Sequence, residues 1–334
     1  MGHALARKPL DLCVTRGESE IVLGNAAVVR VLEVGADVDQ VRPGQRAILF
    51  PVGKTDSWGY MTKALGYDHA GGMGCLASRM TVFGRQLIPI PDDSQYSSVK
   101  WTAFSVRYVT AWANWELTHA VLRLLVDEAE RPRLHVWGWG GGTTLAELDL
   151  ARRFGHETVM LSGSQANLEL IARTGVTALD RRSFGELAYD RRAHKKDPDA
   201  AAGYKRAERA FLAEVEQRTE GHGVDIFVDL IGTPVFHATI KSLAREAIVT
   251  TAGWKLGMSI DYLRAAACIS HHQFVHTHFA KHRHAVEAIE FAERTGWIPE
   301  EPARVYTFDE IPQLAEDYER GQAGYFPCFE IYPD

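Results

Sequence analysis

Several features of exported, membrane-spanning or disulfide-rich proteins are missing from this sequence. No run of about 18 apolar residues occurs anywhere. The N-terminal stretch, Met1 to Leu12, carries charges inside its first apolar segment, which is not the pattern of a signal peptide. The cysteines have no paired spacing, so neither a disulfide framework nor a CxxC metal site is predicted for Cys13, Cys75, Cys268 and Cys328. We therefore expect a cytoplasmic protein without a membrane partner.

An excess of positive charge is also absent. The net charge is −6 at neutral pH, whereas non-specific binding to nucleic acid requires a dense excess of lysine and arginine. This balance argues against a nucleic-acid partner. What is present is a chain of 334 residues, of which 46% are hydrophobic and 24% are charged. That length and composition predict two globular domains, each with its own core.

Both ends of the chain have the pattern of β-structure interrupted by glycine and proline. Residues 21–35 are dense in β-branched side chains, and further strands are predicted over Arg46–Pro51 and Met80–Phe83. From Ser97 to Asp127, apolar residues recur at helical spacing without proline or glycine, which predicts a long connecting helix. We expect Val305–Ile331 to return to the first domain as strand, helix and strand.

Between these parts, strands alternate with helices. The predicted strands are separated by segments long enough for helical crossovers: Leu134–Trp137, Thr158–Leu161, Asp225–Ile231 and Ala247–Ala252. Parallel neighbours in a sheet need a crossover of a dozen residues or more, so this alternation predicts a doubly wound parallel sheet. The predicted fold class is therefore α/β, with a β-rich domain and a Rossmann domain.

A glycine-rich stretch connects the first of these strands to the helix that follows it. In a Rossmann fold, the diphosphate of a dinucleotide meets backbone N–H groups and the positive end of the helix dipole at this place. Glycine is needed because a Cβ would keep the backbone away from the phosphates. Thr144 stands where the GxxGxxG pattern has its third glycine, and a purely structural turn is the alternative interpretation. The predicted cofactor-binding residues are Gly138, Gly140, Gly141, Gly142, Thr143 and Thr144.

The end of the next strand favours NADPH over NADH. It has no acidic residue that could accept hydrogen bonds from a ribose 2′-hydroxyl, and an acid there would also repel a 2′-phosphate. We predict that Ser162, Ser164 and Gln165 bind the 2′-phosphate of NADPH. No lysine or arginine stands beside these residues in the sequence, and a polar turn that caps the next helix is the alternative.

Four stretches follow one another as in the medium-chain dehydrogenase/reductase superfamily, which the chain resembles over residues 22–332: Gly24–Gly44, Leu87–Pro91, Val109–Trp112 and Val136–Gly142. Within this superfamily, the chain looks most like the crotonyl-CoA carboxylase/reductase branch of enoyl-thioester reductases. Three features suggest this branch: the Val-Trp-Gly start of the glycine loop, an insertion around Gly185–Arg209, and His278-Phe279-Ala280 at a strand end.

The resemblance implies a GroES-like catalytic domain over residues 1–105 and 303–334, and a Rossmann domain over residues 106–302. It also implies a homodimer joined through the edges of the Rossmann sheets. The implied reaction is hydride transfer from NADPH to an α,β-unsaturated acyl thioester, which is either a small molecule or bound to a carrier.

Several departures from the family pattern restrict this expectation. Zinc-dependent members have Gly-His-Glu where this chain has Gly24-Asn25-Ala26, so no metal is expected. Ser78 replaces a glutamate that helps to hold carbon dioxide, so we expect a non-carboxylating enzyme. Few residues precede Gly24, which implies an N-terminally shortened catalytic domain. His272-Gln273 stands in place of a Lys-Arg pair, which leaves the recognition of CoA phosphates open.

The resemblance also points to residues near the reacting groups. His278 is predicted to hydrogen-bond the substrate or to act as an acid, and Thr110 to hold the nicotinamide carboxamide through its hydroxyl. Two loops that follow strands are predicted to line the nicotinamide end of the cofactor, through Ile231, Gly232, Ala252 and Gly253. The histidines around His278 alternate as on a strand, which sends neighbours to opposite faces and disfavours a shared metal ion.

Two other functions stay open from the sequence alone. One is a quinone or ketone reductase of the same class. The other is a non-redox descendant of the fold that binds an acyl intermediate, which Thr144, Ser78 and the short N-terminus bring into consideration. The charged residues 186–209 are interpreted either as a solvated surface helix or as a site for the phosphates of an acyl carrier.

Overall fold

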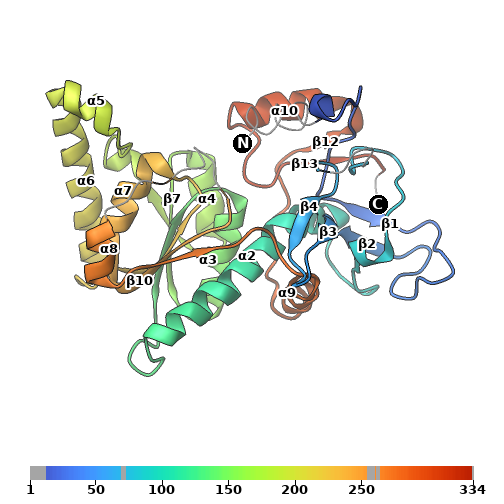
Figure 1. Ribbon diagram of the computed structural model, residues 1–334, viewed down its shortest axis with the longest axis horizontal. Coiled ribbons are helices and arrows are strands. Elements are labelled where there is room, and N and C mark those ends of the chain that lie inside the picture. The colour runs from blue at the N-terminus through green and yellow to red at the C-terminus, as the bar shows by residue number, and fades with distance from the viewer. Residues whose placement is uncertain (1–12, 69–72, 254–259, 261–263, 333–334) are drawn as a thin grey trace. The chain divides into compact units, whose positions relative to one another are not determined.

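The computed structural model describes residues 13–68, 73–253, 260 and 264–332 (Figure 1). The chain forms two compact units. One contains the chain through Thr110 and from Phe279 onward, and the other is Ala111–His278. The sequence-based boundaries, after residues 105 and 302, differ most at the second, because helix α9 (His282–Thr295) groups with the first unit.

The first unit contains short strands in small sheets. One antiparallel sheet has three strands, β1 (Val28–Arg30), β2 (Arg46–Leu49) and β5 (Leu87–Pro89). An antiparallel pair is formed by β3 (Val52–Thr55) and β4 (Met61–Ala64). A parallel pair is formed by β12 (Val305–Thr307) and β13 (Cys328–Glu330). A buried apolar cluster that includes Ala47, Leu49 and Leu87 underlies the first sheet. This is the β-rich domain that the sequence predicts.

One strand prediction in this unit is wrong. Residues Met80–Phe83 are irregular, and a 3-10 turn at Gly84–Gln86 follows them. The Gln86 side chain accepts a hydrogen bond from the Phe83 N–H at 2.9 Å and donates one to the Val52 carbonyl at 2.9 Å. Because the side chain of Gln86 satisfies these backbone groups, the segment bends into β5 instead of pairing.

The C-terminal segment returns to the first unit, as the sequence predicts. After β12, a 3-10 turn (Phe308–Glu310) leads into α10 (Ile311–Glu319) and then β13. The predicted long helix is α2 (Ser98–Leu125), which begins in the first unit and ends in the second. Its first turns pack an aromatic cluster in the first unit, in which the rings of Phe104 and Tyr108 lie 5.0 Å apart.

The second unit is the predicted Rossmann domain. Its six parallel strands have the order β11-β10-β9-β6-β7-β8, and their bounds are His135–Trp139 (β6), Glu157–Ser162 (β7), Thr177–Asp180 (β8), Val224–Asp229 (β9), Leu243–Thr251 (β10) and Gln273–His276 (β11). The helices of this unit, besides the end of α2, are α3 (Gly142–Arg153), α4 (Gln165–Arg173), α5 (Arg191–Lys196), α6 (Pro198–Arg218), α7 (Thr233–Ser242) and α8 (Arg264–Ser270).

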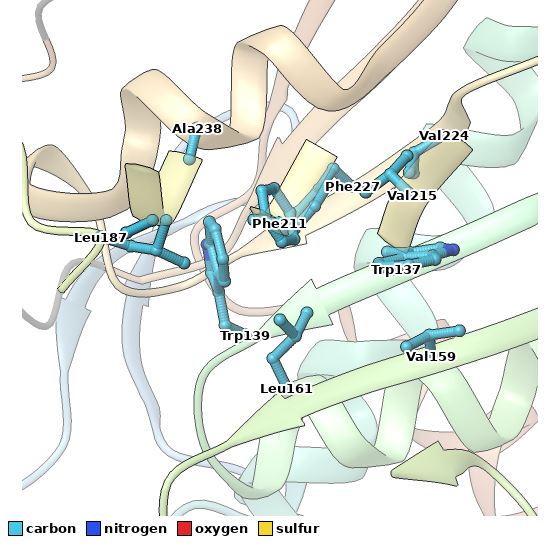
Figure 2. Packing of buried hydrophobic residues seen from close by; sticks show 11 residues of the cluster. Trp137, Trp139, Val159, Leu161, Leu187, Phe211, Val215, Val224, Phe227 and Ala238 are labelled. Atoms are coloured by element: carbon cyan, nitrogen blue, oxygen red, sulfur yellow. The ribbon is translucent and has the colours of Figure 1, made fainter. Parts of the chain in front are cut away.

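Alternation along β6 assigns the helices to the two faces of this sheet. Trp137 and Trp139 point to the same side, where they pack with Phe211 of α6 (Figure 2). Gly138 faces the other side, where Thr144 of α3 lies against it. Within the described ranges, no helix is both long and apolar enough to cross a membrane.

Candidate functional site

The candidate site lies where the central strands of the parallel sheet end. Trp139, the last residue of β6, pairs in register with Leu161 of β7 and with Asp229 of β9. Because the carboxyl ends of parallel strands meet at one edge of the sheet, the loops after β6, β7, β9 and β10 are neighbours there. The structure therefore brings together the segments that the sequence predicts to bind the cofactor.

The glycine loop after β6 has no room for side chains on its inner side. A Cβ on Gly138 would lie 2.8 Å from Thr144 Cγ2 and 2.9 Å from the Val228 carbonyl oxygen, and a Cβ on Gly140 would overlap Thr144 Oγ1. A Cβ on Gly141, by contrast, would meet no atom of the described residues within 4 Å. Gly141 is the N-cap of α3, so the open side of the loop coincides with the positive end of the helix dipole.

Thr144 occupies the space between helix and strand that the third glycine of the motif normally leaves free. The residue is fully buried, and its hydroxyl oxygen has no hydrogen-bond partner in the part of the chain that the structure describes. Gly138 and Gly140 make room for its two γ atoms. Thr144 therefore fits in the space beside Gly138 and Gly140, and it does not cover the side of the loop at Gly141.

Trp139 does not cover the loop either. Its ring packs in the apolar layer on the opposite face of the sheet, with centroids 5.4 Å from Phe211 and 5.0 Å from Phe227 (Figure 2). The glycines that would cradle a diphosphate and the first residues of α3, including Thr143, thus keep an accessible outer side. This arrangement fits a dinucleotide.

A cation that the sequence did not predict lies against the loop after β7. Ser162 is buried, Ser164 is the N-cap of α4, and Gln165 donates to Glu169 at 3.1 Å. A Cβ on Gly163 would lie 2.8 Å from Nε of Arg181 and 3.1 Å from its Nη2, so this guanidinium lies directly against the loop. No arginine is adjacent to these residues in the sequence, but the fold brings Arg181 next to them.

Arg181 reaches this loop because it follows β8, which pairs in parallel with β7. Asp180 ends β8 and makes an exposed ion pair with Arg182 at 2.6 Å. Arg181 has no such pair in the described part of the chain. The short strand Thr177–Asp180 could have predicted this position of Arg181, since residues that follow neighbouring parallel strands lie at the same edge of the sheet.

The loops after β9 and β10 are shaped by their own side chains. The buried Asp229 carboxylate accepts hydrogen bonds from the N–H groups of Ile231 (3.0 Å) and Gly232 (2.9 Å) and from the Thr239 hydroxyl (2.8 Å). Gly232 has a φ of 96°, which favours glycine. After β10, the Thr251 hydroxyl donates to the Gly253 carbonyl at 2.7 Å. Burial raises the pKa of Asp229.

Ala252 and Gly253 follow β10 at the same edge of the sheet. A Cβ on Gly253 would meet nothing within 4 Å among the described residues. The four residues predicted to line the nicotinamide end therefore lie in two adjacent loops. Because Asp229 already uses the N–H groups of the first loop, a cofactor would contact that loop through other atoms.

A second feature that the sequence analysis missed is a buried acid behind the glycine loop. Glu147 of α3 is fully buried, and both its carboxyl oxygens accept hydrogen bonds from Asn114 Nδ2 at 2.9 Å. Asn114 Oδ1 in turn accepts from the hydroxyls of Thr250 (3.0 Å) and Thr277 (2.7 Å). Burial raises the pKa of Glu147 to about 8, so the side chain is a neutral acid at pH 7.

This network joins α3 to Thr250 near the end of β10 and to Thr277 just after β11. The Thr118 hydroxyl, one turn after Asn114 in α2, also donates to the Thr250 hydroxyl at 2.8 Å and so belongs to the same network. Asn114 and Glu147 lie far apart in the sequence, so no local pattern predicts their contact. The network fixes α3, whose first turn carries the glycine loop, against the ends of β10 and β11.

The two predicted catalytic residues lie outside this group of loops. Thr110 is buried in α2 at the boundary of the first unit, and its hydroxyl donates to the Val106 carbonyl at 2.6 Å. His278 is exposed and is the last residue of the second unit. Among the described residues, no group of three or more His, Cys, Asp or Glu side chains is arranged to hold a metal ion.

The second unit has a six-stranded parallel sheet of the Rossmann type, and the loops at one edge of this sheet have room for a dinucleotide. No model of a known family matches the chain. The sequence is 22% identical over 315 residues to the crotonyl-CoA reductase of Streptomyces collinus, covering 90% of this chain and 65% of that protein. It is 24% identical over 225 residues to one of the phenolphthiocerol/phthiocerol polyketide synthase subunits of Mycobacterium tuberculosis, covering 67% of this chain and 8% of that protein.

Solved structures share the whole fold. The crotonyl-CoA carboxylase/reductase AntE in complex with NADP superposes with a TM-score of 0.75 at 20% identity, over 95% of this chain and 80% of that one. An NAD-dependent alcohol dehydrogenase gives 0.73 at 19% identity, over 97% and 88%. The resemblance to medium-chain dehydrogenases and reductases, and to the crotonyl-CoA carboxylase/reductases among them, is confirmed, as is the α/β fold class.

Proposed function

We propose that this protein is an NADPH-dependent reductase of an α,β-unsaturated acyl thioester or a related conjugated carbonyl. The observation that carries the proposal is the glycine loop before α3, open at Gly141, together with the Arg181 guanidinium beside Gly163. The loop offers backbone N–H groups to a diphosphate, and Arg181 offers a cation to a 2′-phosphate. NADH has no group that needs this cation.

The nicotinamide cofactor would be held along the edge of the sheet. When bound, NADPH supplies a hydride to the β-carbon of the substrate; the α-carbon then takes a proton, which leaves a saturated thioester and NADP⁺. Ser162, Ser164, Gln165 and Arg181 would hold the 2′-phosphate of the ribose, and the loops at Gly232 and Gly253 would position the nicotinamide end. Their contribution is orientation of the reacting carbon, which lowers the barrier by restricting geometry.

The names of the similar proteins support the proposed substrate class. Several similar proteins are named as crotonyl-CoA reductases, and one is named as part of a polyketide synthase. His278 is the proposed hydrogen-bond donor or acid toward the substrate carbonyl or the α-carbon, and Thr110 the proposed partner of the carboxamide. The aligned positions Asn25, Ala26 and Ser78 favour a zinc-independent and non-carboxylating reaction.

We also propose that the protein is a cytoplasmic homodimer. Strand β11 is at one end of the six-stranded order, so its outer backbone groups have no neighbour within the described sheet. A second copy could pair there, because an open sheet edge is a template for another strand. Light scattering of the purified chain would report a mass near twice 37.2 kDa.

The proposed reaction is tested by following NADPH absorbance at 340 nm with crotonyl-CoA, with the N-acetylcysteamine thioester of crotonic acid, and with a quinone. Consumption of NADPH with both thioesters supports the proposal, whereas turnover of the quinone alone would assign a quinone reductase. Binding of NADPH without turnover of any acceptor would indicate a non-redox descendant of the fold.

The role of His278 needs a separate variant. His278→Ala should lower kcat by about 100-fold, because general acid catalysis contributes on this order, while the Kd for NADPH stays the same. An unchanged kcat would remove His278 from the mechanism. Exposed His276→Ala serves as the control, since it changes a neighbouring histidine of the same segment.

A further inference from the structure

An exposed basic hairpin lies on the second unit. It consists of α5 and the first half of α6, which contact each other and are adjacent in Figure 1. Seven lysine and arginine side chains on this basic hairpin are exposed: Arg191, Arg192, Lys195, Lys196, Lys205, Arg206 and Arg209. The chain as a whole has a net charge of −6, so the basic hairpin concentrates positive charge on an acidic protein.

Three exposed carboxylates, Asp190, Asp197 and Asp199, lie in the same segment, and the seven cations leave it with a net positive charge. None of the seven makes an ion pair with an acid in the described part of the chain. The ion pairs of α6 use other cations: Arg218 with Glu214, and Lys241 of α7 with Glu208. The nearby Asp197 instead accepts hydrogen bonds from backbone N–H groups at the start of α6. The positive side chains are therefore available to an anionic partner.

The basic hairpin and the segment before it are fixed to α7, the helix that follows the loop at Gly232. Glu208 accepts hydrogen bonds from Lys241 Nζ at 2.7 Å and contacts His237 Nδ1 at 3.2 Å. The ring of Tyr189, just before α5, stacks on His237 with centroids 4.3 Å apart, and its N–H donates to the Pro234 carbonyl at 2.6 Å. Pro234 lies in the first turn of α7, the helix that directly follows the loop at Gly232. The hairpin is thus tied to the predicted nicotinamide end of the site.

We propose that the basic hairpin docks an acidic carrier protein that delivers the acyl group as a thioester. This proposal rests on the proposed reductase function and names its partner. The seven cations are all exposed and come from two helices, whereas a nucleotide is normally held in a concave site that buries most of its surface. A surface of this kind fits the acidic face of another protein, where charge complementarity directs encounter and orientation.

The test compares one acyl group on three thiols: an acidic bacterial acyl carrier protein, CoA and N-acetylcysteamine, each carrying crotonate. The variant is Lys205→Glu with Arg206→Glu, on the solvent side of α6, where lysine, arginine and glutamate have similar helix propensity. We expect kcat/KM for the carrier-bound substrate to fall by about tenfold or more through KM. Rates with the N-acetylcysteamine thioester should not change, and those with CoA should change by less than about twofold.

A matched control changes the same amount of charge elsewhere. Lys54→Glu with Lys63→Glu reverses two exposed cations on β3 and β4 in the first unit. It should leave the carrier-bound rate within about twofold, because these cations are not part of the basic hairpin and isolated exposed charges are screened by salt. An equal loss in this control would mean that total charge, not the basic hairpin, governs the rate. An equal loss with CoA would assign the cations to CoA phosphates and overturn the proposal.

A binding measurement separates this proposal from the reductase proposal. Fluorescence anisotropy of the dye-labelled carrier protein should give a Kd that rises about tenfold in the Lys205→Glu, Arg206→Glu variant and also rises with salt. If no thioester is reduced by the wild-type protein, the reductase proposal fails while this difference still decides the docking surface. Equal anisotropy curves for wild type and variant would contradict the docking proposal whatever the activity.

Discussion

The two faces of the parallel sheet in the second unit are covered by different chemistry. Toward α6 and α7, β6 presents Trp137 and Trp139 to an apolar layer that contains Phe211. Toward α2 and α3, the buried groups include Glu147 and Asn114, joined by hydrogen bonds. One face stabilises the sheet by apolar burial, and the other holds the helix that begins at the glycine loop.

The difference shows that the position of α3 is fixed by buried polar groups, at a cost in stability that depends on pH. The stability that comes from apolar burial does not depend on pH, so the contribution of the aromatic layer should be the same at every pH. A buried carboxyl group costs stability once the unfolded chain can ionise it. Directed hydrogen bonds, however, fix the angle and register of α3 more specifically than apolar contacts do. The face with the buried hydrogen bonds is the one that carries the proposed cofactor site.

The largest expected effect is on the aromatic face. Phe211→Ala should lower the free energy of unfolding by about 3–5 kcal/mol, because it leaves a cavity among large buried rings. The loss, measured by urea unfolding, should be the same at pH 6 and pH 9. Phe154→Ala, which removes a ring that is 48% exposed, should cost less than about 1 kcal/mol. A strongly pH-dependent loss for Phe211→Ala would contradict the contrast between the faces.

On the polar face, Glu147→Gln should change how stability depends on pH. The pKa of Glu147 is about 8 in the folded protein and near its ordinary value of 4.5 in the unfolded chain. Stability from the neutral acid is therefore complete below pH 4.5 and is lost as the pH rises to 8. Glutamine stays neutral, so the variant should gain roughly 2–4 kcal/mol over wild type between pH 5 and pH 8.

Urea unfolding at several pH values checks this prediction. Glu216→Gln, which changes an exposed glutamate of α6, should follow the wild-type pH profile. Parallel profiles for Glu147→Gln and wild type would show that Glu147 is ionised in the folded protein and that the polar face has no special pH dependence.

The glycine loop offers a test of the fit between helix and strand. Gly140→Ala should cost about 1–3 kcal/mol, because its methyl group would overlap the Thr144 hydroxyl. Thr144→Ala removes that hydroxyl, so the double variant should recover most of the loss. Gly141→Ala, where the space is open, should affect stability much less but weaken NADPH binding. Additive losses in the double variant would show that Thr144 does not fill the space below Gly140.

The smallest expected effect concerns the cation at the ribose end. Arg181→Ala should raise the Kd for NADPH by about tenfold, since a charge-assisted hydrogen bond to phosphate is lost. The Kd for NADH should stay the same. Arg182→Ala, which removes an arginine already paired with Asp180, provides the control. Equal losses for both cofactors would mean that Arg181 does not contact the 2′-phosphate.

Local patterns predicted most of the fold, and long-range pairing limited the prediction of the site. The glycine loop follows from strand, turn and helix signals within one short segment. Arg181 was missed because its position depends on the pairing of β8 with β7. Glu147 was missed because its partner Asn114 comes from another helix. Met80–Phe83 has strand composition, but the side chain of Gln86 takes over the backbone hydrogen bonds.

The account depends most on a diphosphate site at the glycine loop. Titration of the wild-type protein with NADPH, followed by nicotinamide fluorescence, tests this directly. The account predicts saturable binding that NADP⁺ displaces and that Gly141→Ala weakens. Absence of any fluorescence change at millimolar NADPH would contradict it.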